Sequence, residues 1–569
     1  MDEVFATLTP ANVLAKVAFS EAFNAITHDR QGASTNAAAH RMSVAAEQEY
    51  QADVLRFRRE MERKFNERAT SESLTEPNTD TELEMRHLGM IWKGHYVLAF
   101  QPAPSELGWT AGKRSVERGS SADIVLCTSA FAKRYSLNLR TSHARFNFDL
   151  QNGAFFIASL TRSSLAEIAV NGEVVGRQMH VLNQHSMKIR VDSLEYEFRY
   201  TNFASTKGFL QIRKDYLATT LNASLSMTFD MPTPHKDTRT FGQWTLNNPL
   251  GKGSAGRVFL ASNSKNQVVA IKVMECTSNS AGAVDKEVAR CRDLTALAQK
   301  LDDGGRLVRL KEILDPREEA SSSSAAFHEV ALVLEPMTPV TLDELVGNQA
   351  MGGSRGMSMK AATILHDALL GLKFLHENGW LHRDIKPQNI GVTLGSPPRA
   401  VILDVGQANV LALGTKFQAT PGRGGTLGYL APEREMSYYD HGADIWPMGV
   451  IAIELTYGHN PFEFAINPWR PGAQYEEIRP AFHQRYQKTV DELSNDYKQC
   501  VGQKTVNRNR SFIHLGDMVV QMLRHEWAQN PRDRARRINV SEALQHPAWE
   551  PLLSDGQQSK RVRLEESGR

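Results

Sequence analysis

Hydrophobic and polar residues alternate in short runs between residues 90 and 201. The clearest runs lie at 124–126, 145–148, 155–157, 168–170, 187–191 and 196–200, and the pairs Asn152-Gly153 and Asn171-Gly172 separate some of them. Short alternating runs bounded by turn-forming residues are typical of strands that bury one face. We therefore predict an all-β sandwich over residues 88–201.

Strands and helices are mixed farther along the chain. Residues 257–260 and 267–271 are predicted to form a hairpin that turns at 263–266, and 330–335 form another apolar strand. Between them, residues 283–297 repeat apolar side chains at helical spacing, namely Val284, Val288, Cys291 and Leu294. This mixture predicts an α+β fold from about residue 241 to 552, so the protein is multidomain.

The remaining segments lack a clear core pattern. Residues 1–87 are rich in Ala, Glu, Arg and Thr, and within them 44–68 could form an exposed helix, although a flexible tail with transient helix is the simpler prediction. Residues 202–240 are predicted to be a linker, and 467–510 a polar insertion with helical character. Residues 553–569 are predicted to be a basic disordered tail, in which 560–565 resemble a nuclear import signal or are simply a solvated tail.

Composition narrows the class of protein. The chain has 569 residues, 41% hydrophobic and 23% charged, which is enough for more than one core. Its net charge of +2 provides no global attraction to nucleic acid or membrane, so we expect neither as a partner. Four widely spaced cysteines predict neither a disulfide framework nor a zinc site, and they fit the nucleus and/or cytoplasm. The sequence shows no apolar run long enough to span a bilayer and no secretory signal.

The strongest candidate chemistry lies in residues 382–389, which read His-Arg-Asp-Ile-Lys-Pro-Gln-Asn. In this run Asp384 could orient an attacking hydroxyl and Lys386 could offset charge on a transferred phosphoryl group. Asn389, together with Asp404 a short hairpin later, offers the oxygen ligands of Mg²⁺. The set indicates phosphoryl transfer. The alternative is a solvated, charged loop.

Upstream, residues 250–258 form a glycine-rich run, followed at strand spacing by Lys272. Glycines let a backbone lie close over phosphates. A dinucleotide-binding turn would open a helix here, whereas the pattern predicts strands, so we reject that alternative. Lys272 needs an anionic partner, for which we choose Glu287 over its neighbour Asp285. The candidate ATP-binding residues are Leu250, Gly251, Gly253, Gly256, Val258, Ala270, Lys272, Glu287, Glu335 and Met337.

In order and spacing, these motifs of residues 241–552 resemble those of a eukaryotic protein kinase domain. Lys386 resembles the serine/threonine branch. The resemblance implies a bilobal α+β fold, ATP and Mg²⁺ as cofactors, and protein substrates with Ser or Thr. It also implies that the backbone of Glu335 and Met337 reads the adenine, that Glu433 and Arg537 form a buried ion pair, and that Asp444 caps the catalytic loop.

Two departures from the family pattern keep a second hypothesis open. Val405 stands where the family usually has Phe, and Gly391 where it usually has a large apolar residue under the adenine. The alternative function is therefore a pseudokinase or phosphopeptide-binding scaffold. By the same resemblance, Arg383 would pair with a phosphorylated activation loop, for which Thr415 and Thr420 are the candidate phosphosites.

The sandwich region resembles a forkhead-associated (FHA) domain, which reads phosphothreonine. The resemblance rests on residues 118–124, on Ser142-His143 and on Asn171-Gly172. It implies a phosphopeptide site of Arg118, Arg140, Thr141 and Ser142, and a phosphothreonine-containing partner. Arg140 replaces the family's serine, and Ala166-Glu167 replace an Asn-Gly pair. The alternative is a sandwich kept for packing. The two domains together resemble checkpoint-type kinases.

Overall fold

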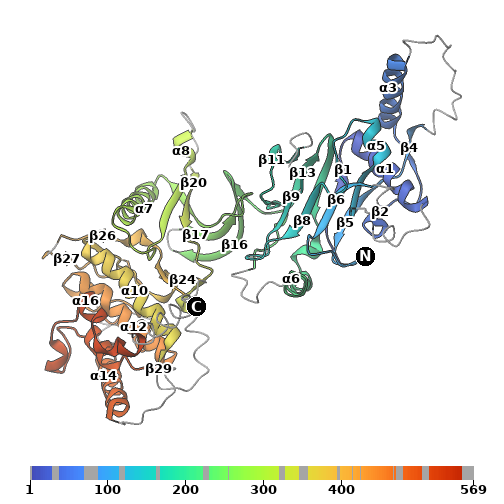
Figure 1. Cartoon of the computed structure of the whole chain (residues 1–569). Coiled ribbons are helices and arrows are strands. Elements are labelled where there is room, and N and C mark those ends of the chain that lie inside the picture. The colour runs from blue at the N-terminus through green and yellow to red at the C-terminus, as the bar shows by residue number, and fades with distance from the viewer. Residues whose placement is uncertain are drawn as a thin grey trace. The chain divides into compact units, whose positions relative to one another are not determined.

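The structure is a computed structural model that describes residues 3–28, 38–69, 88–114, 122–161, 167–221, 230–253, 256–319, 327–344, 357–393, 398–412, 414–422, 424–464, 467–469, 478–502 and 512–553. The chain divides into two compact units (Figure 1). The first is Met1–Pro249 with Phe259–Val268, and the second is Leu250–Val258 with Val269–Arg569.

The first unit is built on two β-sheets. One has the order β11-β10-β13-β14-β1-β5-β2 and the other the order β12-β9-β8-β6-β7. The strands of the larger sheet are β1 (Val4–Pro10), β2 (Met42–Val44), β5 (Gly94–Ala99), β10 (Ile168–Val170), β11 (Glu173–Val175), β13 (Ser186–Val191) and β14 (Leu194–Tyr200). Those of the smaller sheet are β6 (Trp109–Arg114), β7 (Ile124–Thr128), β8 (Ala144–Phe148), β9 (Phe155–Ser159) and β12 (His180–Val181).

Aromatic side chains join the two sheets. Phe5 of β1 lies 5.3 Å from the ring of Trp109 in β6 and 5.2 Å from that of Phe155 in β9, measured between centroids. All three are nearly or fully buried. Edge-to-face contacts between such rings add to the stability gained by burying their area. The N-terminal region is therefore rich in β-sheet, as the alternating pattern predicts.

The sandwich begins much earlier than residue 88. Strand β1 pairs with β14 on one side and β5 on the other, so it is a central strand. Helix α1 (Val13–His28) packs against β7, and α3 (Ala52–Ala69) buries Val54 completely. Residues 4–28 therefore belong to the core instead of forming the flexible tail that we predicted. Strand β3 (Glu49–Tyr50) pairs with β4 (Met90–Ile91) outside the two sheets.

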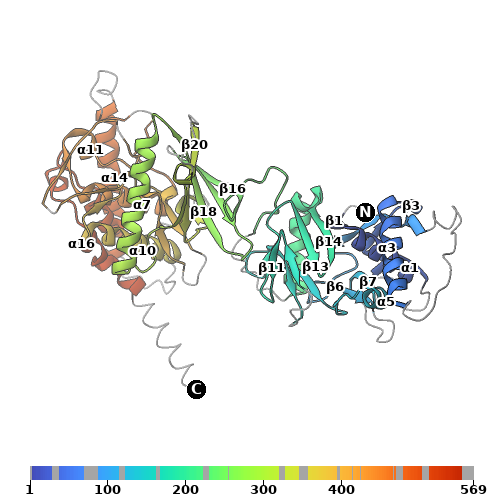
Figure 2. The ribbon, with the colours of Figure 1, turned by 90° about the horizontal axis from the view of Figure 1, so that it is seen from above.

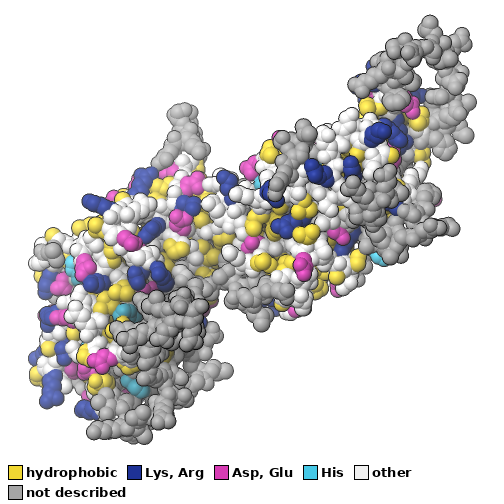
Figure 3. Space-filling model, in the orientation of Figure 1, with side chains coloured by type: hydrophobic (Ala, Val, Ile, Leu, Met, Phe, Trp, Pro, Cys, Tyr) yellow, Lys and Arg dark blue, Asp and Glu magenta, His cyan; other side chains and the backbone are white. Residues whose placement is uncertain are grey.

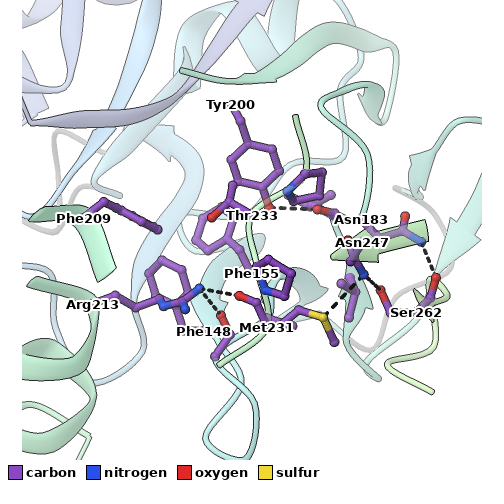
Figure 4. A pocket seen from close by; sticks show the side chains of 16 residues that line it. Phe148, Phe155, Asn183, Tyr200, Phe209, Arg213, Met231, Thr233, Asn247 and Ser262 are labelled. Carbon is purple, nitrogen blue, oxygen red and sulfur yellow. Dashed lines mark hydrogen bonds between the residues drawn. The ribbon is translucent and has the colours of Figure 1, made fainter. Parts of the chain in front are cut away.

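The predicted linker also contains folded structure. Helix α6 (Lys207–Thr219) buries Phe209, Arg213, Tyr216 and Leu217, and it follows the short helix η1 (Asn202–Ser205). Arg213 donates to the carbonyl oxygens of Gly153 and Met231, at 3.1 and 3.0 Å, and Figure 4 shows its guanidinium beside Met231. Because a buried guanidinium needs such partners, these bonds fix residues 230–231 to the unit. Helix α5 (Ser129–Arg134) completes the elements of this unit.

Strands β15 (Thr240–Phe241), β16 (Trp244–Gly253), β17 (Gly256–Ser262), β18 (Val268–Thr277), β20 (Phe327–Glu335) and β19 (Arg309–Leu314) form a six-stranded sheet in that order. Helix α7 (Ala281–Leu301) lies beside this sheet in both ribbon views (Figures 1 and 2) and contacts β19. Its buried side chains include the four apolar positions that predicted the helix. Helix α8 (Pro316–Glu319) precedes β20.

The C-terminal half is mainly helical. Its helices are α10 (Met359–Glu377), α11 (Glu433–Met436), α12 (Ile445–Tyr457), α14 (Ile478–Gly502), α15 (Gly516–Met522) and α16 (Val540–Leu544). Residues 445–455 of α12 are all buried, so this helix forms the centre of the core. The strands are β21 (Val340–Thr341), β24 (Ile390–Val392) and β25 (Ala400–Ile402) in one sheet, and the pairs β22 (Met357–Ser358) with β29 (Phe512–Ile513), β23 (Trp380–Leu381) with β26 (Asn409–Val410) and β27 (Phe417–Gln418) with β28 (Tyr438–Tyr439).

The face drawn in Figure 3 shows no dominant charge. On the face drawn in Figure 3, acidic and basic side chains are interspersed, which agrees with the small net charge. Among the residues that the structure describes, no helix has the length and apolar character needed to cross a membrane.

Candidate active site

The catalytic loop follows β23 and ends in the short helix η2 (Pro387–Asn389). Asp384 in this loop is 8% exposed, and its carboxylate receives side-chain hydrogen bonds from Lys386, Thr426 and Asn389. Lys386 Nζ lies 3.0 Å from its Oδ2, and the Thr426 hydroxyl donates to its Oδ1 at 2.8 Å. Lys386 Nζ also lies 2.9 Å from Thr426 Oγ1. The carboxylate is thus held in one orientation.

Asp444, at the start of α12, fixes the backbone of the same loop. Its carboxylate accepts from the backbone N–H groups of His382 and Arg383, both at 2.8 Å, and lies 3.1 Å from His376 Nε2. Burial alone would raise the pKa of Asp444, but the interactions with His376 and His382 outweigh it and lower the pKa to about 2. The anion therefore caps the loop, in the place where we predicted a cap.

Lys272 of β18 joins two carboxylates. Its Nζ lies 2.6 Å from Glu287 Oε1 and 2.7 Å from Asp404 Oδ1. Burial acts to lower the pKa of Lys272, but Asp404 and Glu287 more than offset this and raise it. The alternative partner, Asp285, instead pairs with Arg317 at 2.9 Å. The structure therefore brings together the three residues that the motifs predicted.

The oxygen atoms expected to hold Mg²⁺ lie on Asn389 and Asp404. The Asn389 amide nitrogen donates to the Asp384 carbonyl at 2.7 Å, so its amide oxygen remains as the acceptor for a cation. Burial acts to raise the pKa of Asp404, but Lys272 overcomes this and lowers it, which keeps the ligand charged. A carboxylate and an amide oxygen are the hard ligands that Mg²⁺ prefers, so these residues fit the ion.

Gly406, two residues after Asp404, joins the metal-binding segment to α7. A Cβ at this position would lie 3.0 Å from the carboxylate of Glu287. Arg290 of α7 donates to the Gly406 carbonyl oxygen. Val405, between Asp404 and Gly406, is 2% exposed, so a buried valine stands where the family usually has phenylalanine. Sequence reasoning did not identify Arg290, because its partner is a backbone atom more than 100 residues away.

Most of the predicted ATP-binding residues lie in β16, β17 and β18 or at the C-terminal end of β20. Gly256 lies so close to β18 that a Cβ would approach Val273 O to 2.3 Å, whereas Gly251 has open space around it. Glu335 ends β20, and its carboxylate pairs with Lys311 at 2.7 Å. Ser254 and Ala255 lie outside the described residues. The other predicted positions are half-buried or exposed, namely Leu250, Val258, Ala270 and Met337.

The space beside Gly391 is filled by another side chain. A Cβ on Gly391 would lie 2.3 Å from Thr338 Oγ1 and 2.7 Å from Thr338 Cβ. Thr338 is 9% exposed. Thr338 thus occupies the volume that a larger residue 391 would need.

Two further parts of the kinase pattern have defined places. Arg537 donates from its guanidinium to both carboxylate oxygens of Glu433, and both side chains are largely buried. Thr415 and Thr420 are exposed, and the Thr415 hydroxyl donates to Ala412 O at 2.6 Å. Both threonines are accessible, and their phosphorylation remains a prediction.

In the sandwich, part of the predicted phosphopeptide site can be located. Arg118 and Ala166 lie outside the described residues. Arg140 and Ser142 are exposed and Thr141 is half-exposed. His143 is fully buried, and its Nδ1 accepts from the Arg140 backbone N–H at 3.3 Å. The backbone of the 140–142 loop is thus hydrogen-bonded to a buried histidine, while the side chains of Arg140 and Ser142 are exposed.

Comparison with known proteins agrees with this geometry. Residues 244–549 match the protein kinase domain family. The chain is 23% identical to the DNA damage response protein kinase DUN1 of Saccharomyces cerevisiae over 489 residues, which is 79% of this chain and 85% of that protein. It is 30% identical to the serine/threonine-protein kinase grp of Drosophila melanogaster over 40% of each chain. Human myosin-IIIa is also 30% identical over 230 residues, which are 38% of this chain and 13% of that protein.

The similarity to DUN1 extends over both units, whereas the other two alignments cover less than half of the chain. The family match alone covers more than half of the 569 residues. This protein therefore belongs to the protein kinase domain family, and it is a serine/threonine kinase that uses ATP and Mg²⁺.

Proposed function

We propose that Asp384 orients the hydroxyl of a protein serine or threonine and accepts its proton during phosphoryl transfer. The observation that carries this assignment is the contact network in which Lys386 and Thr426 hold the two carboxylate oxygens of Asp384. Lys386 would also offset charge that develops on the transferred group. Positioning and charge compensation account for most of the catalysis of this reaction.

The nucleotide would be held from the opposite side. ATP supplies the phosphoryl group, and Mg²⁺ offsets the charge of its phosphates. Lys272 would contact these phosphates, because Glu287 keeps its ammonium group charged and directed toward Asp404. Asn389 and Asp404 would bind the metal through their side-chain oxygens. The backbone of Glu335 and Met337 would contact the adenine.

Replacing Asp384 by Asn tests the assignment. The change removes the proton acceptor but keeps the size of the side chain, so we expect phosphate transfer to a protein substrate to fall at least 100-fold. ATP binding, followed by thermal stabilisation, should stay the same. Asp293→Asn, an exposed carboxylate on α7, is the matched control. Transfer by Asp384→Asn at the rate of the unmodified protein would show that Asp384 has another role.

The same assay separates the kinase from the alternative function. A pseudokinase or scaffold would show no transfer in the unmodified protein, with or without Mg²⁺. The retained Lys272, Asp384, Asn389 and Asp404 favour an active kinase, and the buried Val405 and the filled space at Gly391 leave the site intact.

We also propose that the sandwich binds a phosphothreonine-containing protein and so recruits the kinase to it. The support is the resemblance to FHA domains, together with the outward-facing loop of Arg140, Thr141 and Ser142 above the buried His143. Arg118 would grip the phosphate with its guanidinium fork. Arg140 would add a second cation.

Binding of matched peptides tests this proposal. A phosphothreonine peptide selected from an array should bind far more tightly than its unphosphorylated form. Arg118→Ala should weaken that binding by about 1.5–3 kcal/mol, the contribution of a hydrogen bond to a charged group. Arg177→Ala, an exposed arginine elsewhere on the sandwich, serves as the control. An array without preference for phosphate would leave the sandwich as a packing or docking module.

The similarity to DUN1 supports a place in checkpoint-type signalling. It covers 79% of the chain, which is more than either unit alone contains. The basic residues at 560–565 would direct the protein to the nucleus, in addition to the cytoplasm. Removing residues 553–569 from a fluorescent fusion should then shift it out of the nucleus.

A further inference from the structure

A cluster of two arginines and two aromatic rings lies next to the catalytic loop. The guanidinium carbon of Arg383 is 5.5 Å from the ring centroid of Phe417 and 6.0 Å from that of Tyr439. The guanidinium of Arg434 lies on the same Tyr439 ring, at 5.5 Å. The two rings are 5.7 Å apart. Cations at such distances over aromatic faces are attracted by the negative charge of the ring face.

The two rings come from paired strands that follow the catalytic loop in the sequence. Phe417 is in β27 and Tyr439 in β28, and the two residues are direct partners in the strand pair. The pairing continues with a backbone hydrogen bond from Ala419 N–H to Ser437 O at 2.7 Å. One ring therefore cannot move without disturbing the other strand.

Arg383 connects this cluster to the reacting residue. It directly precedes Asp384, has a left-handed backbone with φ of 71°, and donates its N–H to Asp444. Arg434 donates to its carbonyl oxygen. Backbone strain of this kind persists only where the surroundings enforce it. The position of the Arg383 side chain is thus coupled to the backbone that carries Asp384.

Within the residues that the structure describes, the Arg383 guanidinium contacts aromatic rings and is not paired with a carboxylate. Among the described residues no ion pair of Arg383 is found, and its buried Nε has no hydrogen-bond partner. Phe417 and Tyr439 contact the guanidinium instead.

We propose that Phe417 and Tyr439 are positioning residues that hold Arg383 in place of a phosphate group. The kinase would then be active without phosphorylation of Thr415 or Thr420, contrary to the role that family resemblance implied for Arg383. This inference rests on the assignment of Asp384 as the catalytic carboxylate.

The test uses the full chain, treated with phosphatase and checked by mass spectrometry. The double variant Thr415→Ala/Thr420→Ala should keep kcat within twofold of the unmodified protein. Phe417→Leu keeps an apolar side chain but removes the ring face, and it should lower kcat roughly tenfold, the scale of one cation–ring contact. KM for ATP should be unchanged, since Lys272 and its partners are not touched. Phe417→Tyr keeps an aromatic ring and should have the kcat of the unmodified protein.

Lys416→Ala, an exposed neighbour of Phe417, is the control and should behave as the unmodified protein. Circular dichroism and the melting temperature establish that Phe417→Leu is folded; if it unfolds, Phe417→Met replaces it in the same comparison. The proposal is overturned if phosphatase treatment or the double alanine variant lowers kcat tenfold or more, or if Phe417→Leu keeps full kcat. Absence of transfer in every protein, phosphorylated or not, would overturn the Asp384 assignment and this inference with it.

Discussion

Gly391 gives the sharpest test of packing in the kinase domain. It lies in β24, between Thr341 of β21 and Val401 of β25. Replacing it by Ala places a methyl group 2.3–2.7 Å from three atoms of Thr338. Contacts this short require Thr338 to move, and Thr338 is 9% exposed and thus surrounded by other atoms.

The size of the effect follows from two opposing contributions. Overpacking of a buried site costs about 1–3 kcal/mol. Ala in a strand is favoured over Gly by roughly 0.5–1 kcal/mol, because less backbone entropy is lost on folding. We therefore expect Gly391→Ala to destabilise the kinase domain by about 1–2 kcal/mol. For a domain of this size that corresponds to a fall in its melting temperature of roughly 2–4 °C.

A double-mutant cycle isolates the contact. All three atoms closest to the new methyl group belong to Thr338, so Thr338→Gly removes every one of them. In that background Gly391→Ala should cost nothing or stabilise the domain. Scanning calorimetry of the full chain, in which the transitions of the two units are fitted separately, is the measurement. An equal cost in both backgrounds would refute the reasoning, because it would place the clash elsewhere.

Two other predictions concern charged groups of the same domain. Asp404→Ala should abolish the Mg²⁺-dependent part of the thermal stabilisation by ATP, since it removes a charged ligand; an unchanged shift would point to nucleotide binding without the metal. Burial raises the pKa of Glu454 to about 7, from an ordinary value of 4.5, although the Tyr429 hydroxyl donates to it. The folded state then holds a proton that the unfolded state releases, so stability should fall as pH rises from about 4.5 to about 7, by at most roughly 3 kcal/mol. Glu454→Gln should flatten the melting temperature over this range, and parallel curves for the two proteins would contradict the assignment.

Residues whose chemistry fixes both type and spacing could be found from the sequence. Asp384, Asn389 and Asp404 are of this kind, because phosphoryl transfer needs oxygen ligands and a proton acceptor at set offsets. Glu287 could be chosen over Asp285 only by a weak preference, since both lie within one turn of the same helix. The structure separates them, because Asp285 pairs with Arg317.

Contacts between distant segments could not be found in this way. The ring contact of Phe417 with Tyr439 depends on a strand pair of two residues, which has no periodicity to recognise. Helix α6 was predicted as part of a linker because Ser, Thr and Pro occur toward the end of residues 202–240, although Phe209 and Leu217 are almost fully buried. Strand β1 was missed because it lies within the Ala-, Glu-, Arg- and Thr-rich residues 1–87, and its partners β5 and β14 come far later in the sequence.

The central place of β1 has a consequence for synthesis of the protein. Ala6 pairs with Leu98 and with Tyr200, so β1 is synthesised before both of its partners and must wait for them. At about 5–20 residues per second, the second partner follows after roughly 10–40 s. During that time two apolar strands of the nascent sheet have unpaired edges, which are templates for association with other chains. Chaperone demand should therefore be highest before residue 200 is made, and a fragment that starts at residue 88 would keep those edges open permanently.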